Sequence, residues 1–476
     1  MLFNSVNFVI FFVVITVAYF VLPHKFRWML LLAGSCYFYM AFVPIYILIL
    51  GFTIIIDYFA GIYIEKWQGR KKKWFLITSL FANIGVLSIF KYYNFLNDNL
   101  TAFLYGVGYE NPIPYLSIIL PIGLSFHTFQ AMSYTIEVYR GNQAAEKHFG
   151  IYSLYVMFYP QLVAGPIERP QNLLRQFYEK HEFDYDRVVD GLKQMLWGFF
   201  KKLVIADRLA IYVNAVYNYP EQHNGTTLIV ATIFFAFQIY CDFSGYSDIA
   251  IGAARVMGFK LMTNFRRPYF SMNISEFWKR WHISLSTWFK DYLYISLGGN
   301  RVSVPRWYLN LMLVFLISGL WHGANWTYVI WGGLNGLYLV AAVVFQPLKK
   351  HIDRLTHPDR FPVIDKVFQI LFTFTLTCFA WIFFRANNVD QALMIAGKML
   401  KPQGPLFIDE LSVMLFSVIG ILFLIAAEYR REYITDQASF FYSRNWVVRN
   451  LSYAFLIIII LLAGVFDGGQ FIYFQF

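Results

Sequence analysis

Long apolar runs, spread from one end of the chain to the other, restrict what this sequence can fold into. A bilayer core about 30 Å thick is crossed by about 20 residues of α-helix. Because lipid offers no partner to backbone N–H and C=O groups, a spanning segment must be a helix or part of a closed barrel. The runs comprise residues 3–22, 45–64, 74–90, 228–239, 367–384, 411–427 and 451–466. With 58% hydrophobic and only 14% charged residues, we predict an all-α, polytopic integral membrane protein.

The distribution of Lys and Arg predicts the orientation of these spans. Basic residues cluster at 24–27 and 70–73, whereas 41–44 and 97–114 contain none. Short cytoplasmic loops of membrane proteins are enriched in Lys and Arg, so we expect a multi-pass protein with its N-terminus outside. The formal net charge of +11 is explained by these basic loops, which would lie against the lipid bilayer. We therefore expect no nucleic-acid partner.

Breaks in the apolar pattern predict further elements between the spans. Residues 149–160 are too few to cross a bilayer, and the prolines and glycine within 161–170 interrupt any helix, which favours a re-entrant or interfacial element. The run 307–345 is interrupted near Trp321-His322-Gly323, which favours a helical hairpin. Gly323 and Gly332-Gly333 could equally mark close packing between helices. We expect about 11 to 13 spans plus re-entrant helices.

The motifs of most soluble enzymes are missing from the sequence. Cys36, Cys241 and Cys378 lie in apolar segments without metal-ligand spacing. Neither Gly-x-Ser-x-Gly, His-Glu-x-x-His, a Walker loop nor a Rossmann fingerprint occurs. We therefore expect no metal site and no tightly bound cofactor. No internal repeat separates one part of the chain from another, so we predict a single transmembrane domain over residues 1–476.

His322 lies within an apolar run, where a polar group requires a partner or a function. Ser318, four residues earlier, and Asn325, three residues later, lie at helical spacing from it, and either could hydrogen-bond one ring nitrogen. With Trp321 they would shape a pocket in which a neutral imidazole accepts the proton of a hydroxyl or thiol, as a general base does. The alternative is a structural histidine bonded to a neighbouring carbonyl.

A second histidine, His282, lies in the aromatic and basic segment 275–288. One face of a continuous helix would carry Trp278, Trp281, Leu285 and Trp288. Cations in and before this segment could hold the phosphates of a cytoplasmic donor, and they are Arg266, Arg267, Lys279 and Arg280. The alternative is an amphipathic helix at headgroup level, anchored by its aromatic residues.

Asp242 and Asp248 place carboxyl groups within a predicted span. A charged group at mid-bilayer costs about 2.5 to 3.5 kcal/mol on insertion scales. The stretch 238–248 therefore either lines a water-filled tunnel or forms plain buried ion pairs.

Several of these motifs resemble those of the membrane-bound O-acyltransferase superfamily, and the resemblance covers nearly the whole chain. The motifs lie at residues 163–167, 240–248, 278–286 and 320–323. Within the superfamily, residues 381–387, the following 390–393 and the ending 469–476 resemble the bacterial alginate O-acetyltransferase branch, which also contains peptidoglycan O-acetyltransferases.

The resemblance implies an all-helical fold around a central tunnel that joins a cytoplasmic donor to an acceptor outside. His322 matches the buried histidine of the family and His282 its second motif histidine, so both are catalytic candidates. The candidates for substrate and tunnel contacts are Trp321, Asn325, Ser318, Trp278, Asp242 and Asp248. The resemblance also implies the bacterial cytoplasmic (inner) membrane, acetyl-CoA or an acyl carrier thioester as donor, and an extracytoplasmic SGNH-type acyltransferase as partner.

We therefore expect an O-acetyltransferase that moves acetyl from a cytoplasmic thioester across the membrane to an extracytoplasmic polysaccharide of the alginate or peptidoglycan type. His322 would act as general base or as a transient acyl carrier. One alternative is D-alanyl transfer to teichoic acid by the same fold. Another is a solute transporter or flippase, because transporters also build sites from broken helices and intramembrane polar groups. The last is a non-catalytic scaffold for the extracellular partner.

Overall fold

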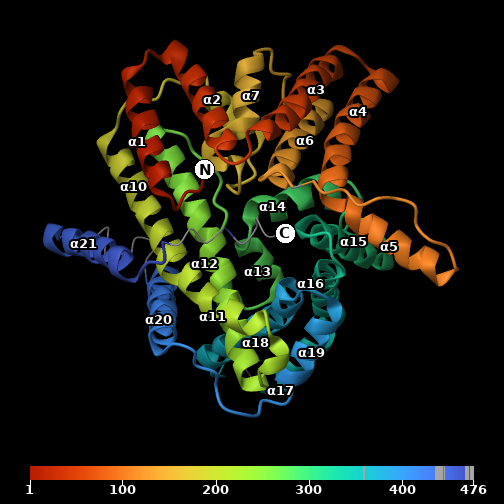
Figure 1. Ribbon diagram of the computed structural model, residues 1–476, viewed down its shortest axis with the longest axis vertical. Helices are drawn as coiled ribbons and strands as arrows, with labels where there is room; N and C mark the ends of the chain where they lie inside the picture. The colour runs from red at the N-terminus through yellow and green to blue at the C-terminus, as the bar shows by residue number, and fades with distance from the viewer. Residues whose placement is uncertain (119, 357–359, 435–442, 444, 467–470, 472–476) are drawn as a thin grey trace. The chain divides into compact units, whose positions relative to one another are not determined.

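The computed structural model describes residues 1–476 except 119, 357–359, 435–442, 444, 467–470 and 472–476 (Figure 1). The described residues form helices and turns and contain no strand, which confirms the all-α prediction. Of the ending 469–476, only Phe471 is among the described residues. The chain divides into two compact units, Met1–Met195 with Tyr246–Met262, and Leu196–Gly245 with Thr263–Phe476.

Each unit is built from consecutive helices. The first contains α1 (Val6–Val21), α2 (His24–Met40), α3 (Ile47–Lys66), α4 (Gly69–Leu87), α5 (Tyr93–Gly106), α6 (Leu124–Arg140), α7 (Phe149–Met157), α8 (Tyr159–Leu162) and α9 (Pro170–Gln176). The second contains α11 (Asp207–Tyr217), α13 (Ile274–Arg280), α14 (Ile283–Trp288), α15 (Val304–His322), α16 (Trp326–Val344), α17 (Gln346–Thr356), α18 (Pro362–Arg385), α19 (Val389–Met399), α20 (Leu411–Tyr433) and α21 (Trp446–Ala463). Both units share α10 (Tyr185–Phe199) and α12 (Gly225–Met257).

A buried carboxyl group joins three helices of the first unit, α3, α4 and α6, which pack against one another (Figure 1). Asp57 of α3 accepts hydrogen bonds from Ser79 Oγ at 2.6 Å and from Asn83 Nδ2 at 2.8 Å, both on α4. Ser79 Oγ also lies 2.9 Å from Thr135 Oγ1 of α6. Polar side chains between membrane helices stabilise their association because each satisfies the other, so this cluster has a structural explanation.

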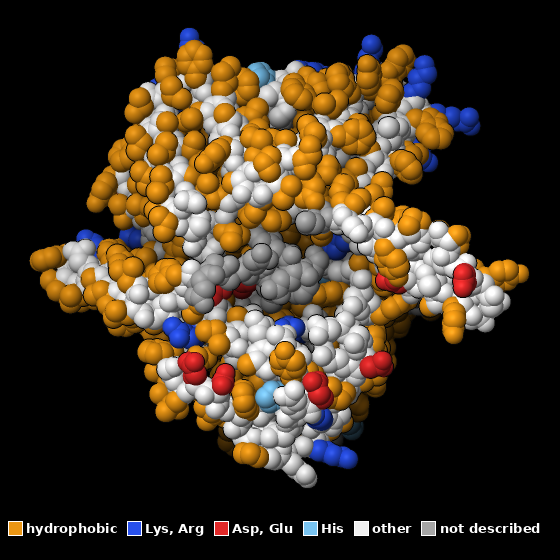
Figure 2. Space-filling model, in the orientation of Figure 1, with side chains coloured by type: hydrophobic (Ala, Val, Ile, Leu, Met, Phe, Trp, Pro, Cys, Tyr) orange, Lys and Arg blue, Asp and Glu red, His pale blue; other side chains and the backbone are white. Residues whose placement is uncertain are grey.

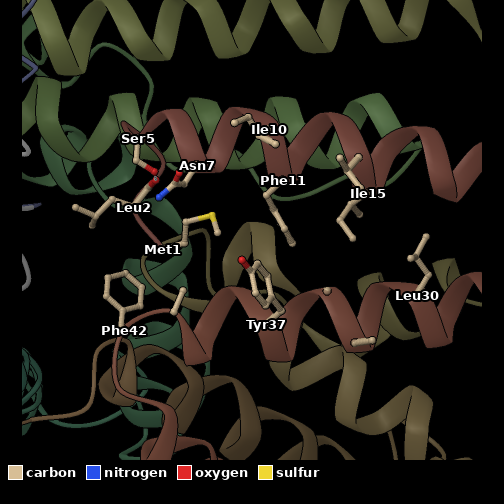
Figure 3. Close-up of a pocket in the computed structure, with 14 residues that line it drawn as sticks. Met1, Leu2, Ser5, Asn7, Ile10, Phe11, Ile15, Leu30, Tyr37 and Phe42 are labelled. Atoms are coloured by element: carbon tan, nitrogen blue, oxygen red, sulfur yellow. Dashed lines mark hydrogen bonds between the residues drawn. The ribbon is translucent and has the colours of Figure 1, made fainter.

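A groove of about 760 Å³ lies between α1 and α2. Figure 3 shows Phe11 and Ile15 of α1 facing Leu30 and Tyr37 of α2 across it. The groove lies wholly on the first unit, and none of the residues predicted for the functional site lines it.

Exposed apolar side chains cover the helices of the first unit on the face that Figure 2 shows, and Lys and Arg gather at the turn between α3 and α4. Within the described residues, eight helical stretches are long and apolar enough to cross a membrane, fewer than the 11 to 13 expected. One predicted span that is not among the eight is α1. It has 16 residues, so at 1.5 Å per residue it is about 24 Å long, less than the bilayer core of about 30 Å. The short elements α7 and α8 confirm that 149–160 does not cross.

The predicted hairpin is present in the second unit as α15 and α16, which pack closely along their length. Glycines allow this approach, because a Cβ on Gly332 would lie 2.2 Å from the carbonyl oxygen of Phe315 and 3.2 Å from the Cα of Gly319. The interpretation of Gly332 as a close-packing residue is therefore confirmed. Helix α16 also packs on α18, which brings residues 381–387 to the hairpin.

Candidate active site

His322 is the last residue of α15, at the point where the hairpin turns. Gly323 follows in extended backbone, and a Cβ there would lie 2.1 Å from the ring of Tyr328. Glycine is needed at this position because of that ring, and not because of its φ angle. The imidazole is only 3% exposed, whereas Trp326, at the start of α16, is 53% exposed. A few residues therefore separate the buried histidine from the surface of the turn.

Aromatic rings surround the imidazole of His322. Its centroid lies 4.9 Å from that of Trp321, 5.0 Å from Trp331 and 5.4 Å from Phe384. Trp381 packs on Trp331 at 5.7 Å and on Phe384 at 5.2 Å. Close packing of this kind fixes the orientation of the imidazole, and the apolar walls strengthen any electrostatic interaction made inside them.

Asn325, one of the two residues that could have hydrogen-bonded His322, uses both side-chain atoms elsewhere. The side-chain oxygen of Asn325 accepts from the N–H of Thr327 at 3.0 Å, and its nitrogen donates to the carbonyl of Asn387 at 3.0 Å. The reason is that α16 begins at Trp326, and its first N–H groups need a capping acceptor. Ser318 is buried one turn before His322.

The segment around His282 is not the continuous helix that its apolar spacing predicts. Helix α13 ends at Arg280, α14 begins at Ile283, and His282 between them has a left-handed backbone with φ 42°. Arg267 is also left-handed, with φ 48°. Two backbone hydrogen bonds connect the segments on either side of these residues. The N–H of Arg266 donates to the carbonyl of Arg280 at 2.9 Å, and the N–H of Ile283 donates to the carbonyl of Asn264 at 2.8 Å.

Such backbone costs about 1 to 3 kcal/mol for a residue other than glycine and is concentrated at functional sites. The two strained residues therefore support the choice of this segment as part of a site.

Asn264 determines which nitrogen of His282 carries the proton. Its side-chain oxygen accepts from the N–H of Ser284 at 3.3 Å and from Ser284 Oγ at 2.9 Å. Nδ1 of His282 lies 3.2 Å from the same oxygen, so Nδ1 donates and Nε2 bears the lone pair of a neutral ring. Burial lowers the pKa of His282 to about 3, although a backbone hydrogen bond acts in the opposite direction. The ring is therefore neutral at physiological pH.

Trp321 brings the two candidate histidines together. Its ring centroid lies 4.9 Å from that of His322 and 6.4 Å from that of His282. Trp278 joins the same cluster through Trp331, at 5.8 Å. The structure thus brings together four residues that were predicted for the site. Trp278 and His282 come from one segment, and Trp321 and His322 from another about 40 residues later.

Asp242 belongs to a buried ion cluster of the second unit. Nζ of Lys202 lies 2.7 Å from a carboxylate oxygen of Asp242 and 2.7 Å from one of Asp207. The alternative of plain buried ion pairing therefore describes Asp242. Asp248 belongs to the first unit, where Gln194 donates to its carboxylate at 3.0 Å.

The four cations expected to hold donor phosphates differ in exposure and in their partners. Arg266 and Lys279 are exposed, as phosphate-binding cations must be. Arg267 and Arg280 instead share the carboxylate of Glu432, at the end of α20, and Arg280 also pairs with Glu276 at 2.6 Å. A phosphate would have to compete with these carboxylates for either arginine.

Sequence reasoning missed several residues of the assembled site. They are Asn264, Trp331, Phe384, Lys202 and Glu432, whose places depend on contacts between distant elements. The motif at 381–387 could have indicated Phe384, because that motif belongs to the resemblance. For Glu432, no local pattern marks the contact.

Comparisons with known proteins place this site within a matched region. The model of the MBOAT family, the membrane-bound O-acyltransferase family, matches residues 140–384, which include both histidines. The probable alginate O-acetylase AlgI of Azotobacter vinelandii is 38% identical over 79% of this chain and 72% of its own length. The peptidoglycan O-acetyltransferase of Helicobacter pylori is 35% identical over 79% of this chain and 74% of its own.

A more distant similarity extends over a smaller part of the chain. The teichoic acid D-alanyltransferase of Bacillus subtilis is 27% identical over 56% of this chain and 69% of its own length. The two O-acetylating relatives thus match more of the sequence and match it more closely.

Proposed function

Since the chain belongs to the membrane-bound O-acyltransferase family and is a multi-pass membrane O-acyltransferase, we propose that it moves acetyl groups from a cytoplasmic thioester across the membrane for O-acetylation of an extracytoplasmic polysaccharide. The names of its alginate- and peptidoglycan-acetylating relatives support acetyl as the group and a glycan as the acceptor. The donor is acetyl-CoA or an acetylated carrier protein. The protein would lie in the bacterial cytoplasmic membrane, with its N-terminus outside.

The observation that carries the proposal is the buried imidazole of His322 at a hairpin turn, enclosed by aromatic rings. In the proposed step, this imidazole removes the proton of the acceptor hydroxyl as its oxygen attacks the thioester carbonyl. The C–O bond forms, the C–S bond breaks, and the departing thiolate takes the proton from the imidazolium. His282, neutral and held by Asn264, would position Trp321 and the donor rather than carry a proton.

The exposed Arg266 and Lys279 would make the first contacts with the phosphates of the donor. The acetyl group would leave on the side of the hairpin turn, where an SGNH-type acyltransferase would complete transfer to the glycan.

Release of free CoA from acetyl-CoA by the purified protein, with a soluble saccharide as acceptor, tests this proposal. General acid–base catalysis contributes about 10²- to 10⁴-fold, so His322→Ala should lower the rate by about that factor. His351→Ala, at an exposed histidine of α17, is the matched control and should keep the rate. His351→Ala should retain the thermal midpoint of the wild type, whereas His322→Ala should still unfold cooperatively but at a lower temperature, because it leaves a cavity among the surrounding rings.

Other outcomes separate the alternatives. A His322→Ala protein that releases CoA at the wild-type rate would remove His322 from the mechanism. A wild-type protein that moves solute into vesicles and releases no CoA would be a transporter. Preference for a D-alanyl thioester would favour the teichoic acid reaction.

A further inference from the structure

Helix α5 of the first unit carries a row of exposed apolar side chains. Figure 1 shows it leaving the end of α4 and extending outward, away from α3 and α6. Leu96, Leu100 and Phe103 are all exposed, and they lie four and three residues apart, so they share one face of this 14-residue helix. The structure therefore leaves an apolar face of α5 open to whatever surrounds the protein.

This apolar face continues one that begins on α4. Ile77, Phe81 and Ile84 are exposed on α4 at steps of four and three residues. The next exposed apolar residue is Ile89, five residues after Ile84, in the π-helical turn η2 (Ser88–Tyr92). Because a π-helical turn joins residues five apart, the extra residue keeps Ile89 on the face of Ile84. The face that α4 would turn toward lipid thus runs on into α5.

The length of this helical path explains why α5 changes direction. The stretch Gly69–Gly106 has 38 residues, so a straight helix over it would be about 57 Å long at 1.5 Å per residue. That is nearly twice the hydrocarbon core of about 30 Å, and the apolar face of α5 would stand in water. The change of direction at η2 (Figure 1) instead allows α5 to follow the membrane surface.

The opposite face of α5 is polar, and the chain that follows the helix covers it. Asn94 bonds to the backbone of Leu116 twice, because its Nδ2 donates to the carbonyl at 2.9 Å and its Oδ1 accepts from the N–H at 3.0 Å. Asn111 Nδ2 donates to Asn97 Oδ1 at 2.7 Å and to Thr101 Oγ1 at 2.8 Å. These side chains are hydrogen-bonded within the segment, so the apolar face is the one that remains for an outside partner.

The composition of the segment fits the boundary between lipid and water. Residues 92–139 contain no Lys or Arg, as expected on the outer side of the membrane. Tyr105 and Tyr109, at the end of α5 and just beyond it, are exposed. Tyrosine is enriched where a bilayer meets water, because its ring is apolar and its hydroxyl is polar.

We propose that α5 is an interfacial anchor on the outer side of the membrane. Leu96, Leu100 and Phe103 would lie against lipid acyl chains, and residues 111–116 would face water. Lipid is the occupant of the apolar face because that face continues the one on a membrane-spanning helix. The anchor would fix the depth of α4 in the bilayer, and with it the depth of α3 and α6. This inference is independent of the proposed function, since it uses only the packing and charge of the first unit.

Spin labels on introduced cysteines test the proposal in liposomes of phosphatidylethanolamine and phosphatidylglycerol. Oxygen concentrates in the apolar bilayer, whereas a water-soluble nickel chelate is excluded from it. Labels on Leu96→Cys and Phe103→Cys should therefore have an oxygen-to-nickel collision ratio severalfold higher than the label on Thr101→Cys. Thr101 is the matched control because it is also exposed and lies between the two on the opposite face of the helix.

The labelled proteins can retain most of their natural sequence. Cys241 and Cys378 are buried and Cys36 is half-buried, so the full-length Cys36→Ser protein is the background. The same protein without an added cysteine measures residual labelling.

Two outcomes would overturn the proposal. If the labels at Leu96 and Phe103 meet the nickel chelate as often as the label at Thr101 does, α5 projects into water and its apolar face belongs to a partner protein. If both labels are protected from oxygen and from nickel, a second copy of the chain covers the face instead of lipid.

Discussion

His282 shows how much a single residue can depend on contacts that sequence spacing does not reveal. Its left-handed backbone (φ 42°) follows from hydrogen bonds between 264–266 and 280–283, two segments whose pairing has no local signature. The same limit applies to Asn325, whose distance from His322 in the sequence fits a helix that has already ended. The histidines themselves could be chosen from sequence, because a polar ring within an apolar or aromatic segment is conspicuous.

The stability of the protein should depend on pH through His282. Burial holds its pKa at about 3, below the ordinary value of about 6.5. The neutral ring therefore contributes stability above pH 6.5 that is lost as the pH falls toward 3. In His282→Asn, the thermal midpoint should fall less over this window than in the wild type.

His282→Ala is the control for backbone strain. Asn adopts left-handed backbone more readily than Ala does, so His282→Asn should be the more stable variant at pH 8. If both variants lose stability with pH as steeply as the wild type, other groups account for the dependence.

At the scale of the elements, apolar length and interruption were sufficient to predict the hairpin, but periodicity failed at residues 275–288. The first prediction succeeds because a histidine and glycine inside a long apolar run leave few other arrangements. The second fails because α13 has 7 and α14 has 6 residues, so each is shorter than the stretch over which a helical face can be recognised.

The fit between α15 and α16 can be tested at two adjacent glycines. Gly332→Ala would place a methyl group 2.2 Å from the carbonyl oxygen of Phe315, and overpacking typically costs about 1 to 3 kcal/mol. Gly333→Ala would place it 3.5 Å from Leu316 Cδ2, an ordinary contact. Thermal unfolding in detergent should therefore show a clear loss of stability for Gly332→Ala and little change for Gly333→Ala. Equal effects of the two would contradict this packing.

At the scale of the whole molecule, the class of protein was predictable, and the number of spans was not. Apolar composition excludes a soluble domain, whereas the count depends on helices such as α1 and α2, with 16 and 17 residues, which lie near the length needed to cross. The pairing of distant residues, such as Arg280 with Glu432, also depends on the complete fold.

The orientation that the charge distribution predicts can be measured by labelling introduced cysteines. Gln68 and Tyr109 are both exposed, and they lie at the basic turn after α3 and in the segment after α5 that lacks Lys and Arg. In a background without the natural cysteines, Tyr109→Cys should react with an impermeant maleimide in intact spheroplasts. Gln68→Cys should react only after the membrane is opened. The reverse pattern would place the N-terminus in the cytoplasm.

The packed aromatic rings around His322 should give the protein a spectroscopic signal. The indoles of Trp331 and Trp381 are nearly parallel, at 18°, with centroids 5.7 Å apart. Aromatic rings held in fixed, asymmetric packing give circular dichroism in the near ultraviolet, and this signal disappears when the packing is lost. The protein therefore carries an optical signal of its own that reports, without substrate, whether the pocket is assembled.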